Sequence, residues 1–238
     1  MSNTNLEMLL TVVKGLGELA DDVVFVGGSV AELYASNVEL SDIRPTLDVD
    51  CIIEVSSKLA YYKLEEKLHQ KGFKNDTSED APICRWLYKG VKVDIMPVDE
   101  KIIGFSNIWY SEGIKNKISR TIQENIKIFI FRPEYYLASK LEAHKNRGSK
   151  DLRQSHDFED IIYLLDNYPD IINDISNAND KIKRYIRLEF INFQNNRNLI
   201  EGIECALPYG ADAEGTDIIL KIIDEIISIP IKKKLSKK

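Results

Sequence analysis

The sequence is poor in cysteine and histidine, the residues that build disulfides and many transition-metal sites. Its 238 residues include three of each. The cysteines are Cys51, Cys84 and Cys205, and the histidines are His69, His144 and His156. The cysteines are scattered and odd in number, without a Cys-x-x-Cys pair, which argues against a disulfide framework and a zinc site. The histidines have no ligand spacing with the cysteines or with one another, so we expect no histidine metal site.

Long apolar runs and an excess of positive charge are also missing. No apolar stretch approaches the roughly 20 residues that a membrane-spanning helix needs. The N-terminal stretch MSNTNLEMLL lacks the basic region and the long apolar run of a signal peptide. We therefore expect a cytoplasmic protein with no membrane partner and with reduced thiols. The formal net charge of −6 gives no general affinity for nucleic acid, so such a partner would need a local basic patch.

The apolar pattern that is present divides the chain into a mixed front half and a helical back half. With 44% hydrophobic residues, the chain has a globular composition and suits one elaborate domain or two small ones. Strands are predicted at 23–26, 47–55, 83–88, 91–98 and 126–131, and helices at about 5–20, 30–36 and 58–71. Lys89-Gly90 is a two-residue hairpin signal. From Glu134 onward the pattern is helical, so we predict an α/β core over 1–132 and a helical domain over 133–238.

Two aspartates stand one residue apart in the strand predicted at 47–55. The side-chain period of two places Asp48 and Asp50 on one face, and Val49 and Cys51 on the other. Carboxylates about 7 Å apart, two strand rises of roughly 3.3 Å, repel one another when bare. Mg²⁺ prefers oxygen ligands and would remove that repulsion. The pair is therefore a candidate metal site, and the alternative is a strand end with two solvated aspartates.

The stretch Gly27-Gly28-Ser29 separates the first predicted strand from a predicted helix. Glycines let the backbone approach a ligand closely, and the N–H groups that begin a helix attract phosphate. Ser29 adds a hydroxyl. The stretch is therefore a candidate phosphate-binding turn, and the alternative is a tight turn whose serine caps the helix.

A third carboxylate, Asp94, is the lone charge between the apolar residues Val93 and Ile95 of GVKVDIMPV. The hairpin signal at Lys89-Gly90 would place this strand beside ICRWLY. Asp94 then either faces water at a sheet edge or points to a shared metal site. Taken alone, its position favours the edge.

In this order, the motifs resemble those of the nucleotidyltransferase superfamily, which has the polymerase-β-like fold. The resemblance covers about residues 20–100 and implies a mixed sheet flanked by helices. It makes Gly28 and Ser29 the phosphate turn, Asp48 and Asp50 the catalytic metal-binding pair, and Asp94 the third metal-binding carboxylate.

The segment 135–165 looks like the one that follows the core in AbiEii-type toxins and related bacterial nucleotidyltransferases. There a helix carries a lysine, an Arg-Gly follows, and an Asp-x-x-Asp opens another helix. The corresponding residues are Lys140, Arg147 with Gly148, and Asp157 with Asp160, while Arg44 ahead of TLDVD also fits. The link 149–155 is longer than in that group, and His156 stands where an arginine is common.

Elementary chemistry gives these residues several roles. Lys140 and Arg147 can contact phosphate oxygens. Asp157 and Asp160 share one helix face. They can fix the two cations by ion pairing, orient an acceptor, or simply cap the helix and face solvent.

The resemblance implies an enzyme that transfers a nucleoside monophosphate from an NTP to an acceptor hydroxyl and releases pyrophosphate. Two Mg²⁺ ions would bind Asp48, Asp50 and Asp94, and Gly27 to Ser29 with Lys140 would bind the NTP phosphates. The favoured acceptor is RNA, tRNA in particular, and the chain would be the toxin partner of an antitoxin protein.

RNA would meet a basic cluster in the segment 140–153. Its members are Lys140, Lys145, Arg147, Lys150 and Arg153. The alternatives are a small-molecule acceptor, as in antibiotic nucleotidylation, a protein hydroxyl, or a module that binds nucleotide or a partner without catalysis. The acidic chain argues mildly against long RNA contacts.

Overall fold

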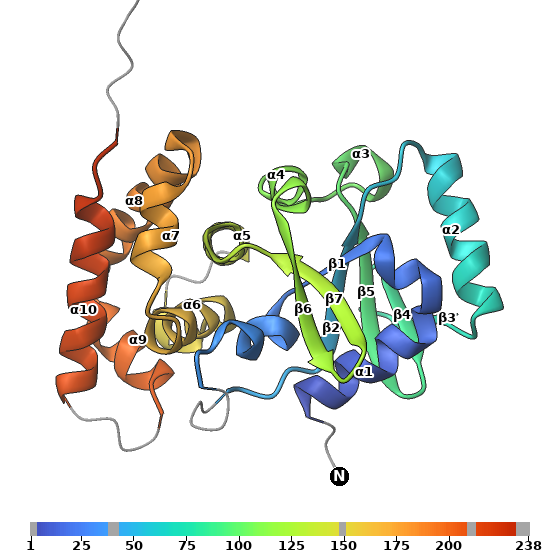
Figure 1. Cartoon of the computed structure of the whole chain (residues 1–238), viewed down its shortest axis with the longest axis horizontal. Coiled ribbons are helices and arrows are strands. Elements are labelled where there is room, and N and C mark those ends of the chain that lie inside the picture. The colour runs from blue at the N-terminus through green and yellow to red at the C-terminus, as the bar shows by residue number, and fades with distance from the viewer. Residues whose placement is uncertain (1–3, 38–42, 148–150, 209–212, 232–238) are drawn as a thin grey trace, which may run out of the picture. The chain divides into compact units, whose positions relative to one another are not determined.

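The structure is a computed structural model, and it describes residues 4–37, 43–147, 151–208 and 213–231 (Figure 1). The chain forms two compact units. The first comprises Met1–Leu33 and Ile43–Arg132, and the second comprises Tyr34–Asp42 and Pro133–Lys238. The sequence predicts two contiguous domains, 1–132 and 133–238, but the structure assigns Tyr34–Asp42 to the second unit. The place of this segment is explained by the ring contact of Tyr34 with Tyr136, whose centroids are 4.6 Å apart.

The first unit is built on a seven-stranded sheet. The strands are β1 (Val23–Val26), β2 (Asp48–Ile53), β3 (Lys74–Asn75), β4 (Arg85–Tyr88), β5 (Val91–Pro97), β6 (Lys117–Gln123) and β7 (Ile126–Phe131). Their order across the sheet is β3-β4-β5-β2-β1-β7-β6. The pairs β2–β5 and β1–β7 are parallel, and the others are antiparallel. The predicted mixed α/β class is therefore confirmed.

Two hairpins form part of this sheet. Lys89 and Gly90 have φ values of +47° and +82° and join β4 to β5, which confirms the predicted turn. The second hairpin joins β6 to β7 through Asn125, whose φ is +63°. The sequence did not predict β6 or the two-residue β3.

Helices pack against the sheet of this unit. The helices of this unit are α1 (Asn5–Leu16), α2 (Lys58–Gln70), α3 (Glu100–Ile103) and α4 (Tyr110–Lys115), with the 3₁₀ helices η1 (Gly17–Asp21) and η2 (Gly28–Tyr34). Tyr61 of α2 donates a hydrogen bond to the carbonyl of Ile95 at 3.3 Å, and His69 of α2 packs edge-on against Trp86. In Figure 1, α1 and α2 lie beside β4 and β5.

The second unit is helical, as predicted. It contains α5 (Pro133–Arg147), η4 (Leu152–Gln154), α6 (His156–Asn167), α7 (Ile171–Asn177), α8 (Asp180–Gln194), α9 (Leu199–Ala206) and α10 (Ala213–Ser228). Proline at the first position of α5 suits a helix start, because its missing N–H needs no partner there. Most of α5 is buried, including its charged residues Lys140 and Glu142. Phe158, Phe190 and Phe193 form an edge-to-face cluster around the unit's core.

No helix in the described part of the chain combines the length and the apolar character that crossing a membrane requires.

Candidate functional site

Three carboxylates lie on the sheet face opposite Trp86, the β4 residue that His69 of α2 contacts. Asp48 and Asp50 alternate with buried Val49 in β2, as the sequence predicts. Asp50 pairs directly with Asp94 in the parallel β2–β5 register. Because directly paired residues point to the same face, all three side chains share it. Asp94 is buried in a strand with neighbours on both sides, so the interpretation of Asp94 as a solvated edge residue is wrong.

An arginine that the sequence analysis missed holds these carboxylates. Arg85 in β4 lies directly opposite Asp94. Its Nε and Nη2 donate to the two Asp94 oxygens at 2.7 Å each, and Nη2 also reaches Asp48 Oδ2 at 2.8 Å. The hydrogen bonds to Asp94 raise the pKa of Arg85 above its ordinary value, so the guanidinium stays charged. The hairpin could have revealed the pair, because residues 85 and 94 are equally distant from Lys89-Gly90.

Gly27 ends β1 against the same carboxylates. Its φ is +75°, a backbone conformation that favours glycine. A Cβ at this position would lie 1.9 Å from Asp50 Oδ2. The glycine is therefore required because the turn approaches Asp50. The sequence predicts an approach to a bound phosphate, whereas the contact in the structure is with the Asp50 side chain.

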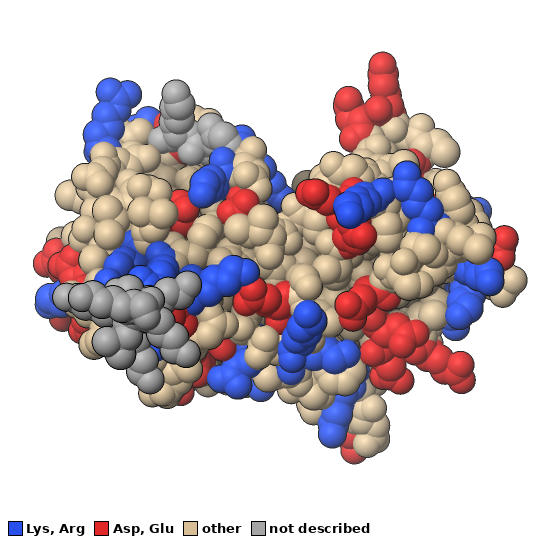
Figure 2. All heavy atoms as spheres, turned by 90° about the horizontal axis from the view of Figure 1, so that it is seen from above, with Lys and Arg blue, Asp and Glu red and all other residues tan. Residues whose placement is uncertain are grey.

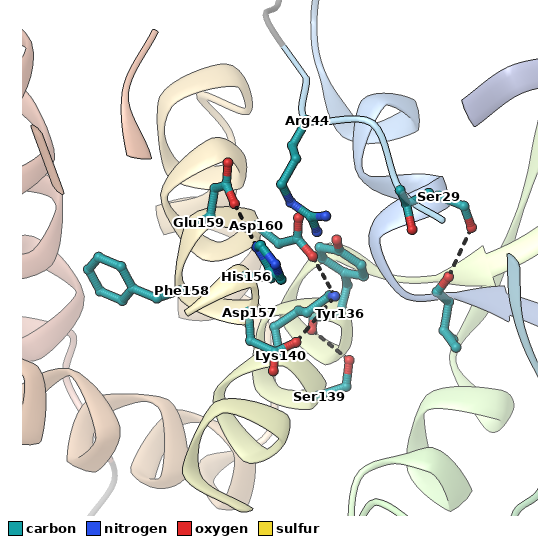
Figure 3. Close-up of polar contacts among 12 residues, drawn as sticks. Ser29, Arg44, Tyr136, Ser139, Lys140, His156, Asp157, Phe158, Glu159 and Asp160 are labelled. Carbon is teal, nitrogen blue, oxygen red and sulfur yellow. Dashed lines mark hydrogen bonds and ion pairs between the residues drawn. The ribbon is translucent and has the colours of Figure 1, made fainter. Parts of the chain in front are cut away.

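The turn continues differently from the prediction. Gly28–Tyr34 is a 3₁₀ helix of seven residues. Ser29 is fully buried, and its hydroxyl donates to the carbonyl of Val26 at 3.5 Å (Figure 3). The predicted phosphate-binding hydroxyl thus points back to the end of β1.

The segment before β2 is fixed by α1. The Asn5 side chain donates to the Arg44 carbonyl at 3.2 Å and accepts from the Thr46 N–H at 3.0 Å. Thr46 Oγ1 then donates to Asp48 Oδ1 at 3.2 Å. The Arg44 guanidinium hydrogen-bonds to the carbonyl of Pro45 at 3.4 Å. The structure therefore connects Arg44 to the entry of β2 through its backbone.

Two buried thiols lie next to the carboxylate strands. Burial, reinforced by the charges of Asp50 and Asp94, raises the pKa of Cys51 well above its ordinary value. Burial and the charge of Asp94 raise the pKa of Cys84 to about 12. Both thiols are neutral at physiological pH, so neither is a thiolate nucleophile.

The predicted back-half residues form a separate ion-pair network in the second unit. Lys140 of α5 is buried, and its Nζ lies 2.5 Å from Asp160 Oδ2 and 3.5 Å from Asp157 Oδ1 in α6 (Figure 3). Arg147 Nη1 contacts Asp157 Oδ2 at 2.8 Å. The ion pairing that the sequence allowed is therefore present, and it links α5 to α6. Ser155, the residue before α6, caps the helix by accepting from the N–H of Phe158.

The other described cations of the segment 140–153 are paired as well. Lys145 contacts Glu189 at 3.0 Å, and Arg153 contacts Asp151 and Glu201 at 2.7 Å each. Gly148 and Lys150 lie outside the described residues. Figure 2 shows acidic and basic side chains interspersed over the face that it presents. The segment is thus not an uncompensated basic surface over its described part.

No model of a known protein family matches this chain, and no curated protein matches it in sequence. The likeness of its motifs to those of nucleotidyltransferases therefore stays an expectation from the sequence. The function has to be inferred from the chain's own residues.

The carboxylate cluster offers the ligand type that Mg²⁺ prefers. Asp48, Asp50 and Asp94 present only oxygen atoms, and their shared face matches a hard divalent cation. Over the described ranges, no group of three His, Cys, Asp or Glu side chains is arranged to hold a metal ion. Arg85 explains the arrangement, because its guanidinium binds oxygen atoms of Asp48 and Asp94. The oxygen ligands of the three aspartates therefore suit Mg²⁺, but in this structure Arg85 holds two of them.

Proposed function

We propose that the chain is a Mg²⁺-dependent nucleotidyltransferase that moves a nucleoside monophosphate from an NTP to an acceptor hydroxyl. One observation carries the proposal. The register pairs Asp50 with Asp94 on the face that also carries Asp48, next to a glycine turn that Asp50 itself requires. Three carboxylates on one face repel one another unless cations hold them, and Arg85 offsets part of that repulsion, so a divalent cation that also draws in Asp50 would suit the set.

In this mechanism Asp48, Asp50 and Asp94 would hold the cation. Bound Mg²⁺ would neutralise triphosphate charge and lower the pKa of the attacking hydroxyl. The acceptor oxygen forms a bond to the α-phosphorus, and the bond from that phosphorus to the oxygen of the leaving pyrophosphate breaks. A carboxylate beside the hydroxyl accepts its proton, and Asp94, buried and central in the cluster, is our choice for that role.

The identity of the acceptor hydroxyl has less support than the reaction itself. RNA, as the substrate of a toxin that an antitoxin protein restrains, remains the expectation from the sequence. Its physical basis is weaker in the structure, because each described cation of the segment 140–153 contacts a carboxylate. Lys140 forms ion pairs with Asp157 and Asp160, so we assign it no phosphate contact. Small-molecule and protein hydroxyls are therefore tested alongside RNA.

The test is transfer of label from each α-³²P NTP, with Mg²⁺ and either total RNA, protein-depleted extract or whole extract. The expected result is a labelled product with equimolar pyrophosphate. The double variant Asp48→Asn, Asp50→Asn removes two charges and keeps side-chain size, and it should reduce both signals to background. The matched control is Asp80→Asn, an exposed aspartate of the same unit, which should behave like the wild type. Equal labelling by the double variant and the wild type would refute the proposal.

A second function is favoured by one observation, the ion pairs of Arg85. They satisfy Asp48 and Asp94 without a metal, as suits a nucleotide-binding module that does not catalyse. Such a module would gain thermal stability with NTP because ligand binds only the folded state. It would release no pyrophosphate with any acceptor, and this outcome separates it from the enzyme.

A further inference from the structure

We propose that Arg85 is a built-in counter-ion of the carboxylate cluster and that it competes with divalent cations for Asp48 and Asp94. The inference rests on the proposed function only in that a divalent cation binds these carboxylates. It requires no catalysis. It assigns to Arg85 a positioning role that the sequence motifs do not include.

The hydrogen bonds leave little room for both partners. Arg85 uses both oxygens of Asp94 and Oδ2 of Asp48. The second Asp48 oxygen accepts from Thr46. A cation that uses Asp48 and Asp94 would sit next to the guanidinium that binds the same carboxylates, and the two positive charges repel at such distances. We therefore expect a bound cation to displace Arg85.

The cluster is accessible enough for this exchange. The Asp48 side chain is 28% exposed, so a cation can reach it from solvent. A released guanidinium then lies beside any triphosphate that arrives with the metal, and its planar fork suits phosphate oxygens. Nucleotide would offer Arg85 a new partner, so metal should bind more tightly with nucleotide than alone.

Binding of Mn²⁺ as the metal alone tests the competition. Free Mn²⁺ is measured by electron paramagnetic resonance during titration of the full chain without nucleotide. Arg85→Gln should bind Mn²⁺ about tenfold more tightly than the wild type, or ~1.4 kcal/mol. Adding Asp48→Asn to Arg85→Gln should remove that gain.

Lys92→Gln is the matched control. Lys92 is exposed and pairs with Asp48 across β2 and β5, so it is a nearby positive charge on the same face. Arg85, by contrast, donates hydrogen bonds directly to Asp48 and Asp94. Lys92→Gln should change Mn²⁺ affinity by less than about threefold. An equal gain in Mn²⁺ affinity in both variants would mean that any nearby positive charge weakens Mn²⁺ binding, and it would overturn the proposal. Unchanged Mn²⁺ affinity in Arg85→Gln would overturn it as well.

A second measurement uses the wild type, in case Arg85→Gln does not fold. The Nε–H of Arg85 donates to Asp94 and should exchange slowly with water in a ¹H–¹⁵N spectrum. Saturating Mg²⁺ should speed its exchange, because that hydrogen bond is lost. An unchanged Nε–H at saturating Mg²⁺ would show that both partners coexist, which refutes the competition.

The two proposals can fail separately. Tighter Mn²⁺ binding by Arg85→Gln without pyrophosphate from any protein preparation supports the counter-ion and rejects the enzyme. Pyrophosphate from the wild type with unchanged Mn²⁺ affinity in Arg85→Gln supports the enzyme and rejects the counter-ion.

Discussion

Replacing Gly27 with alanine is expected to disturb the carboxylate cluster directly. A Cβ would lie 1.9 Å from Oδ2 and 2.7 Å from Cγ of Asp50, so the turn or the carboxylate must move. The φ of +75° adds left-handed strain of roughly 1–2 kcal/mol. Overpacking at a filled site costs about 1–3 kcal/mol more. The expected loss in the free energy of unfolding is therefore ~2–5 kcal/mol.

Gly90→Ala separates the two contributions. Gly90 has a similar φ of +82°, but a Cβ there meets nothing within 4 Å. Its replacement should cost only the strain, roughly 1–2 kcal/mol. Urea denaturation followed by tryptophan fluorescence measures both variants, because Trp86 and Trp109 are buried in the first unit.

A double-mutant cycle then locates the collision. Asp50→Ala removes Oδ2 and Cγ and leaves only the Asp50 Cβ, 2.9 Å from the added atom. In that background Gly27→Ala should cost less than in the wild type but somewhat more than Gly90→Ala, because the two Cβ atoms still approach too closely, and the coupling should be roughly 1–3 kcal/mol. Equal losses for Gly27→Ala and Gly90→Ala in the wild type, together with no coupling, would refute the contact between the turn and Asp50.

Two further predictions concern the second unit, and far-UV circular dichroism during urea denaturation measures both. Lys140→Met removes the buried ammonium that lies between Asp157 and Asp160, and although Arg147 still contacts Asp157, the loss should cost about 3–5 kcal/mol. Arg153→Met breaks ion pairs to Asp151 and Glu201 in which both partners are partly exposed, so it should cost less than about 1 kcal/mol, and a loss similar to that of Lys140→Met would contradict the structural role of Lys140. Burial lowers the pKa of His144, against the charges of Asp157 and Glu189, so the unfolded chain takes up a proton at a higher pH than the folded one. The free energy of unfolding should therefore fall as the pH drops from about 6.5 through the lower folded pKa of His144. His144→Gln should lose this part of the pH dependence. An unchanged pH dependence in His144→Gln would exclude His144 as its source.

Local chemistry made part of this fold predictable. Lys89-Gly90 predicts a two-residue turn because its conformation suits glycine and its length fixes the register. The alternation around Val49 predicts a common face for Asp48 and Asp50 because the strand period is two. Both signals depend on a few adjacent residues.

The remaining features depend on residues far apart in the chain. β6, with the sequence KISRTIQ, is an edge strand whose side chains are mostly half-buried or exposed, so its apolar pattern is weak. The place of Asp94 inside the sheet follows from the β2–β5 pairing, which links segments more than forty residues apart. Arg85 was overlooked because its neighbours Cys84 and Trp86 indicate packing, although counting outward from Lys89-Gly90 places it opposite Asp94.

The two units use the same arrangement, one cation between two aspartates, with different consequences. Lys140 binds Asp157 and Asp160, whose side chains are 3% and 5% exposed. Arg85 binds Asp48 and Asp94, and Asp48 opens to solvent. An external cation can reach the second pair but not the first, because entry to a buried pair would first require desolvating the ion or opening the helices. The buried pair therefore links α5 to α6, whereas we propose that the pair bound by Arg85 exchanges its arginine for a metal ion, which is why we place the proposed reaction there.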